Sequence, residues 1–173
     1  KITFNATGTT NVTLSWDEPT NETDVTYEVN YWNTSSTFTV QTKKAVVTLQ
    51  NLKSGTKYSV DAVRVGAGGS NNGHFVGSVF TKPMPVKSLW GSFSSADSIS
   101  LFWTKPDGYQ STYSYRVQTN ITSPSTLISN IKVTNETATI PNLTPGETYS
   151  FTVFTTAADN VTKSDPVSLP TFT

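Results

Sequence analysis

The sequence contains no cysteine and a single histidine, His74, among its 173 residues. The first absence excludes disulfides, thiol catalysis and cysteine-ligated metals, and the second excludes any site that needs two imidazoles. No apolar run approaches the ~18–20 residues that a membrane span needs. Lys1 begins an alternating segment rather than the apolar core of a signal peptide. We therefore expect neither membrane contact nor a signal peptide in this segment.

Charged residues are also scarce. They make up 14% of the chain, and 12 basic and 12 acidic side chains cancel to a formal net charge of zero. A nucleic-acid-binding surface needs a basic footprint, which is missing here. An anionic membrane would likewise find no basic cluster to hold. We therefore expect no nucleic acid and no membrane surface among the partners.

Hydroxyl and aromatic residues are abundant instead. The chain has 31 Thr and 21 Ser, and 12% of its residues are aromatic. Threonine favours strands because its β-branched side chain fits a pleated, half-exposed surface. Each aromatic ring buries a large apolar area, which compensates for a modest apolar content. This composition predicts a folded, β-rich chain.

One sequence unit occurs twice. Three segments of the first half have similar counterparts in the second half, in the same order. Val12–Trp16 matches Ile99–Trp103, Tyr27–Val29 matches Tyr115–Val117, and Leu52–Tyr58 matches Leu143–Tyr149. The period of about 90 residues is too long for a solenoid repeat and is the size of one small β-sandwich. Within each copy apolar and polar residues alternate, and turn residues separate the alternating runs. We predict strands throughout and essentially no helix.

The boundary between the two copies lies in Thr81–Pro85, which contains two prolines with one residue between them. Two such prolines cannot both sit in a central strand, and they stiffen a short connector. The predicted domains are residues 1–82 and 83–173. Trp90 follows the connector. It has two interpretations, as a strand residue that covers the edge of the second core or as an interdomain contact.

The ordered set of a strand-borne Trp, Tyr-x-Val and Leu-x-x-Gly-x-x-Tyr resembles the fibronectin type III domain. The resemblance implies an all-β fold, two immunoglobulin-like β-sandwiches of fibronectin type III topology in tandem, joined by a short proline-containing linker. It also implies that Trp16 and Trp103 fill the two cores and that Tyr58 and Tyr149 form tyrosine corners. A true immunoglobulin domain would show a Cys…Trp…Cys pattern, and a cytokine-receptor module would also bring cysteines; the sequence has none.

The stretches Trp103–Gly108, Tyr113–Val117 and Thr137–Gly146 are also similar to ectodomain repeats of receptor-type protein tyrosine phosphatases of the density-enhanced phosphatase type. In that subgroup the extracellular part consists of fibronectin type III repeats. The resemblance implies a single-pass receptor whose phosphatase domain lies outside this chain.

Eight Asn-x-Ser/Thr sequons are present, and none has proline in the middle position. They begin at Asn5, Asn11, Asn21, Asn33, Asn120, Asn135, Asn142 and Asn160. Given the number of hydroxyl residues, chance alone predicts roughly half as many. The excess indicates N-linked glycans and passage through the secretory pathway. An accidental origin in a Thr-rich sheet is the alternative. Asn142 is the weakest site because Pro145 directly follows Thr144.

We find no catalytic, cofactor-binding or metal-binding constellation and expect no enzyme activity in this segment. The glycine-rich stretch 66–74 is expected to be a loop that joins the last two strands of the first domain. Such a loop is either a tolerated flexible hairpin or a partner-adapting surface. On the second interpretation its candidate contact residues are Gly68, Gly69, Asn72 and His74.

The sequence therefore predicts a non-catalytic extracellular segment of a glycosylated cell-surface receptor, serving as spacer and protein-recognition surface. Its partner would be an extracellular protein ligand or receptor. The sequons leave residues 51–116 free, so we expect a partner to dock there. Two alternatives remain open: a module of an extracellular matrix or adhesion protein, and an accessory module of a secreted carbohydrate-active enzyme.

Overall fold

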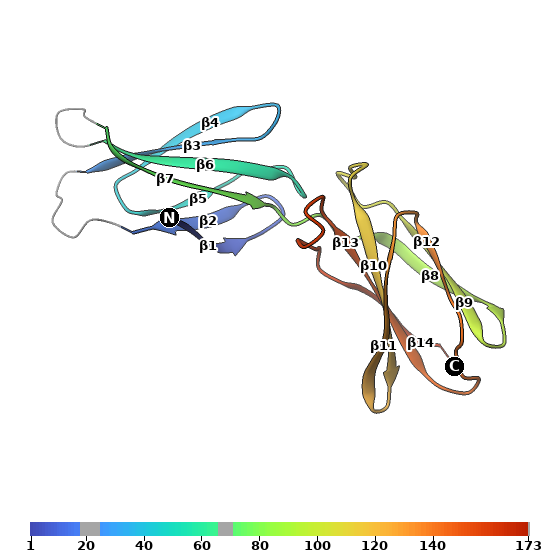
Figure 1. The fold of residues 1–173 in the computed structure, drawn as a ribbon. Coiled ribbons are helices and arrows are strands. Elements are labelled where there is room, and N and C mark those ends of the chain that lie inside the picture. The colour runs from blue at the N-terminus through green and yellow to red at the C-terminus, as the bar shows by residue number, and fades with distance from the viewer. Residues whose placement is uncertain (18–24, 66–70, 173) are drawn as a thin grey trace. The chain divides into compact units, whose positions relative to one another are not determined.

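The computed structural model describes residues 1–17, 25–65 and 71–172. These residues form strands and no α-helix, as the sequence predicted, and the all-β fold of two sandwiches is confirmed. The chain divides into two compact units, Lys1–Lys82 (unit 1) and Pro83–Thr173 (unit 2), shown in Figure 1. Within the described ranges, no helix is long and apolar enough to cross a membrane.

Unit 1 consists of two antiparallel sheets. The three-stranded sheet has the order β1-β2-β5, with β1 at Ile2–Thr7, β2 at Val12–Trp16 and β5 at Val46–Leu49. The four-stranded sheet has the order β4-β3-β6-β7, with β4 at Thr37–Thr42, β3 at Thr26–Trp32, β6 at Lys57–Val65 and β7 at Asn71–Phe80. The alternation seen in the sequence separates a buried from an exposed face on the inner strands.

The core of unit 1 lies between these sheets. On β2, Val12, Leu14 and Trp16 are buried while the residues between them are partly exposed. Trp16 meets Tyr27 of the opposite sheet edge-on, with 5.1 Å between ring centroids. Such aromatic pairs favour edge-to-face contact because the positive ring edge meets the negative ring face.

Unit 2 repeats this arrangement. Its three-stranded sheet has the order β12-β9-β8, with β8 at Lys87–Ser95, β9 at Ser98–Thr104 and β12 at Thr137–Ile140. Its four-stranded sheet has the order β11-β10-β13-β14, with β10 at Ser114–Thr122, β11 at Ser125–Val133, β13 at Tyr149–Thr156 and β14 at Val167–Phe172. Trp103 meets Tyr115 edge-on, with 5.3 Å between ring centroids, and this pair corresponds to Trp16 and Tyr27 in unit 1.

A buried tyrosine ties a loop to each core. The Tyr58 hydroxyl accepts a hydrogen bond from the backbone N–H of Lys53 at 2.9 Å. The Tyr149 hydroxyl accepts one from the N–H of Thr144 at 2.7 Å. Both loops turn through a glycine with positive φ, 55° at Gly55 and 85° at Gly146, a conformation that other residues adopt with strain.

Two local expectations need correction. Trp90 lies in a strand, β8, but it is 53% exposed on the outer face of its sheet and does not cover the edge of the core. The glycine-rich stretch 66–74 is not a loop throughout, because β7 begins at Asn71 and pairs with β6 as far as Val65. His74 is therefore a strand residue.

Candidate functional site

Val76, on the four-stranded sheet, is the most exposed large apolar side chain among the described strand residues of unit 1. Strand pairing arranges the outward-facing residues of this sheet in rows, and we call this surface the outer face of unit 1. The rows across β4, β3, β6 and β7 are Gln41–Glu28–Val63–His74, Thr39–Asn30–Asp61–Val76 and Thr37–Trp32–Ser59–Ser78. Since inward and outward residues alternate along a strand, these side chains share one surface.

A contact between a histidine and a carboxylate joins two strands on this face. The His74 Nδ1 atom lies 3.0 Å and 3.1 Å from the two carboxylate oxygens of Asp61. The side chain of His74 is 57% exposed and that of Asp61 is 26% exposed. A carboxylate that orients an imidazole also occurs in hydrolase triads, but there the imidazole must reach a nucleophile in a pocket. Here the pair stands on an open sheet surface, which suits binding better than catalysis.

Two apolar side chains stand exposed among the polar residues. Val76 is 62% exposed and Trp32 is 39% exposed. Beside them the Thr39 hydroxyl donates to the Asn30 side-chain oxygen at 2.8 Å. Exposed tryptophan is a frequent anchor of protein–protein contacts, and a polar rim around it is typical of such surfaces. The arrangement can therefore bind a protein surface.

The predicted partner-binding residues are only partly placed. Gly68 and Gly69 lie outside the described residues, and Asn72 lies in β7. His74 alone can be assigned to a defined surface, the outer face of unit 1. The partner of His74, Asp61, was not identified from the sequence. Asp61 could have been identified by pairing the two alternating segments on either side of the glycine-rich stretch as antiparallel strands.

Three sequon asparagines of unit 1 lie among the described residues. Asn5 and Asn11 are exposed, and the Asn5 amide donates to the Ser15 hydroxyl at 3.0 Å. Asn33 follows β3 in a turn, and Asn21 lies outside the described residues. None of the asparagines that begin a sequon is among the paired residues of the outer face of unit 1.

Asn33 is engaged by its own turn. Its side-chain oxygen accepts hydrogen bonds from the N–H groups of Ser35 at 2.8 Å and Ser36 at 2.9 Å. Its amide nitrogen donates to the Tyr58 hydroxyl at 3.3 Å. Asparagine commonly stabilises turns in this way. A structural role therefore accompanies the sequon at this position.

The sequons of unit 2 lie on several elements. Asn120 is half-buried on β10, whereas Asn135, Asn142 and Asn160 are exposed in bends and loops. The loop of Asn160 is held by Asp159, which accepts bonds from the Val161 N–H at 3.1 Å, the Thr162 N–H at 2.9 Å and the Thr162 hydroxyl at 2.6 Å. Burial alone would raise the pKa of Asp159, but these hydrogen bonds outweigh it and lower that pKa.

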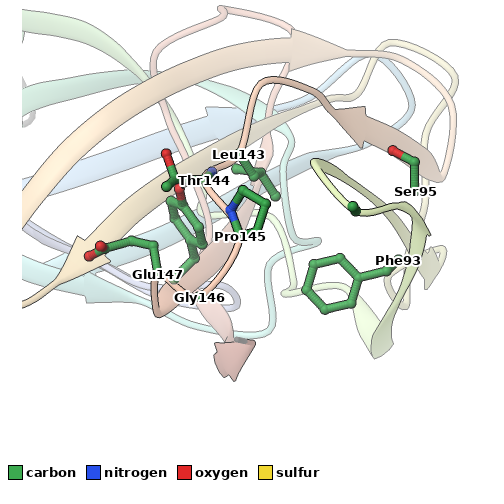
Figure 2. A pocket seen from close by; sticks show the side chains of 9 residues that line it. Phe93, Ser95, Leu143, Thr144, Pro145, Gly146 and Glu147 are labelled. Carbon is green, nitrogen blue, oxygen red and sulfur yellow. Dashed lines mark hydrogen bonds between the residues drawn. The ribbon is translucent and has the colours of Figure 1, made fainter.

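Unit 2 also has shallow hollows on its surface. One of about 220 Å³ lies between the β8–β9 turn and the loop that precedes β13, and Figure 2 shows its lining side chains, among them Phe93, Pro145 and Glu147. Its volume is below the ~300 Å³ at which ligand pockets begin. A second hollow of about 390 Å³ includes Asn142 in its lining, and a third of about 260 Å³ includes Asn160. Glycans on these asparagines would stand at the rims of those two hollows.

No metal or catalytic cluster is found in the described ranges. Nowhere within them do three side chains of His, Asp or Glu gather closely enough to hold a metal ion. Neither His74 nor Asp61 lines any of the three hollows. The outer face of unit 1 therefore lies outside these hollows, and an open sheet surface of this kind suits a macromolecule better than a small substrate.

Comparison with known proteins gives consistent matches. Residues 1–75 and 85–171 match the model of the fibronectin type III domain. The chain is 35% identical over 164 residues to receptor-type tyrosine-protein phosphatase eta of Gallus gallus, covering 91% of this chain and 11% of that protein. It is 31% identical over 157 residues to receptor-type tyrosine-protein phosphatase H of Homo sapiens, covering 88% of this chain and 14% of that protein.

A solved structure that also consists of two such domains is the two fibronectin type III domain segment from chicken tenascin. It matches with a TM-score of 0.62 and 20% sequence identity, over 98% of this chain and 95% of that one. At this identity the likeness shows the fold alone. The predicted resemblance to tandem fibronectin type III repeats of receptor-type phosphatases is confirmed.

Proposed function

The chain belongs to the fibronectin type III family, and we propose that it is a non-catalytic extracellular segment of a glycosylated single-pass receptor of the tyrosine phosphatase class. Fibronectin type III domains are binding and spacer modules, and no catalytic group was found among the described residues. Any phosphatase activity would belong to another part of the protein, because the chain spans only 11% and 14% of the two curated relatives.

The two relatives support a receptor over the other two alternatives. Both are receptor-type tyrosine phosphatases, and both are similar to nearly the whole of this chain. The likeness to the tenascin segment concerns the fold and adds nothing for a matrix protein. A sugar-processing parent enzyme has no counterpart among these matches.

The sequons support an extracellular location. Of the eight, five begin at an asparagine that the structure describes as exposed, namely Asn5, Asn11, Asn135, Asn142 and Asn160. Glycosylation requires a solvated asparagine. With only 14% charged residues, the surface also has less of its usual source of solubility, which glycans would supply.

Recognition is assigned to the outer face of unit 1. The observation that carries this assignment is the coincidence of exposed Val76 and Trp32 with strand rows that contain none of the described sequon asparagines. Glycans on Asn5 and Asn11, which lie on and beside β1 of the other sheet, would hinder partners there and leave the rows of this face accessible. An extracellular protein is the expected partner, because a flat face with apolar anchors and a polar rim fits a protein surface.

Binding of the glycosylated, multimerised protein to a panel of cells tests this function. We expect Val76→Asp and Trp32→Ala to lower cell staining at least tenfold, because loss of an interface anchor costs ~2 kcal/mol or more. Val46→Asp is the matched control, since Val46 is a 42% exposed valine on the other sheet of the same unit. Equal staining by all three variants and the unaltered protein would assign recognition to another surface.

A further inference from the structure

Two aromatic side chains form an exposed stack on unit 2. Trp90 of β8 and Phe102 of β9 lie with ring centroids 4.5 Å apart and planes inclined by 24°. They occupy the outer face of the three-stranded sheet, because the neighbouring Gly91 faces the core: a Cβ there would lie 3.0 Å from the Leu101 side chain. Trp90 is 53% exposed and Phe102 is half-buried, so the two rings present an apolar platform on this face of the sheet.

A sequon reaches the same face from the opposite edge of the sheet. Thr137 of β12 pairs with Phe102, and Phe102 pairs with Trp90, so these residues form one row across the three strands. Thr137 is the hydroxyl residue of the sequon that begins at Asn135. The row therefore links the sequon directly to the aromatic stack.

Asn135 itself is exposed in the bend that leads into β12. The residue between it and Thr137, Glu136, turns inward, where its carboxylate accepts a hydrogen bond from the buried Tyr115 hydroxyl at 2.8 Å. The Glu136 carbonyl also accepts from the Trp103 N–H at 3.2 Å, which extends the pairing with β9 by one residue. Asn135 is the residue directly before Glu136 in this bend, so an exposed sequon asparagine lies at the start of β12.

We propose that the first sugars of an N-linked glycan on Asn135 pack over the Trp90–Phe102 stack. Neighbouring strands are ~4.8 Å apart, so the sheet is roughly 10 Å wide from β12 to β8, a distance that an asparagine side chain and the core sugars together can cross. The apolar C–H face of N-acetylglucosamine would bury the exposed face of the indole. This inference rests on the glycosylation included in the proposed function.

The rest of the face suits a sugar as well. Ser92, Ser100 and Thr139 form the next row across the same strands, and the Ser100 and Thr139 hydroxyls lie 3.4 Å apart. Hydroxyls can donate and accept hydrogen bonds, as sugar hydroxyls do. A glycan that crosses from Asn135 to Trp90 thus meets an aromatic platform flanked by adaptable polar groups.

Acrylamide quenching of tryptophan fluorescence tests the contact. The protein is secreted from mammalian cells with Trp32→Phe, so that Trp90 is the exposed indole while Trp16 and Trp103 are each 5% exposed. We expect the quenching constant to rise roughly twofold when the bulky N-glycans are released enzymatically. The Asn135→Gln variant should show the higher constant before release. Asn120→Gln, which removes a sequon on the other sheet, should behave like the parent.

Two results would overturn the inference, and they differ. If glycopeptide analysis finds no glycan on Asn135, both the proposed contact and the proposed glycosylation of this site are wrong. If Asn135 is occupied but release of the glycan leaves quenching unchanged, only the contact is wrong. Trp90 would then be a free surface for a protein partner. The release experiment on the parent protein needs no folding of a new variant.

Discussion

At the scale of single residues, the hydroxyl groups of Tyr58 and Tyr149 each hold a loop against a core through one hydrogen bond to a backbone N–H. Tyr58 and Tyr149 could be identified from the sequence because the spacing Leu-x-x-Gly-x-x-Tyr resembles a known family pattern. Spacing could not reveal that Tyr58 also accepts from Asn33, since that contact depends on where the β3–β4 turn lies relative to β6. The same limit applies to Asp61, whose contact with His74 depends on strand register.

We predict that Tyr58→Phe lowers the free energy of unfolding of unit 1 by about 1–2 kcal/mol, because the Lys53 N–H loses its partner while partly buried. Tyr149→Phe should do the same in unit 2 through the Thr144 N–H. Tyr31→Phe is the control, with an expected change within about 0.5 kcal/mol. Urea denaturation of each variant measures these changes, and equal stabilities for all three would refute the role of the hydroxyls.

The carboxylate of Asp159 should make unit 2 sensitive to acid. Hydrogen bonds lower its pKa in the folded state, so it contributes stability above its unfolded pKa of ~3.9 and loses that contribution as pH falls through the lower folded value. Because the group is partly exposed, we expect less than about 1 kcal/mol. Asp159→Asn should therefore lower stability at pH 6 and converge with the parent as the pH falls below the lowered pKa of folded Asp159. A constant difference across this range in denaturation experiments would contradict the assignment.

At the scale of elements, alternation located the strands but not always their faces. On β8 the inward position is taken by Gly91, because a larger residue would meet Leu101, Ile99 and Leu169. Because neighbouring residues of a strand face opposite sides, Trp90 is turned outward, although its large ring would favour burial. The residues that precede His74 are typical of turns, so the sequence did not predict that β7 begins there. Pairing with β6 overrides their local preference.

Substitution of Gly91 tests this packing. A Cβ at this position would approach the Leu101 and Ile99 side chains to 3.0 and 3.1 Å, so Gly91→Ala should destabilise unit 2 by about 1–3 kcal/mol. Ser92→Ala, one residue further on the exposed face, is expected to change stability by no more than about 0.5 kcal/mol. Thermal unfolding followed by circular dichroism would measure both. Similar melting temperatures for the two variants would mean that the core accommodates the extra methyl group.

At the scale of the whole molecule, the repeat in the sequence corresponds to two units with separate cores. Each core is centred on one Trp–Tyr pair with nearly the same geometry, 5.1 Å in unit 1 and 5.3 Å in unit 2. Composition and repeat length were sufficient to predict this organisation. They do not identify a recognition surface, because that depends on which residues of paired strands come to share a face.

The central claim, a glycosylated extracellular receptor segment, is tested most directly by intact-mass and glycopeptide mass spectrometry of protein secreted from mammalian cells. We predict several occupied sequons, including the exposed Asn5, Asn11, Asn135 and Asn160, each adding a glycan to the polypeptide mass of 18.8 kDa. Secreted protein with an unmodified mass of 18.8 kDa would contradict the claim. The sequons would then be accidents of a threonine-rich sheet.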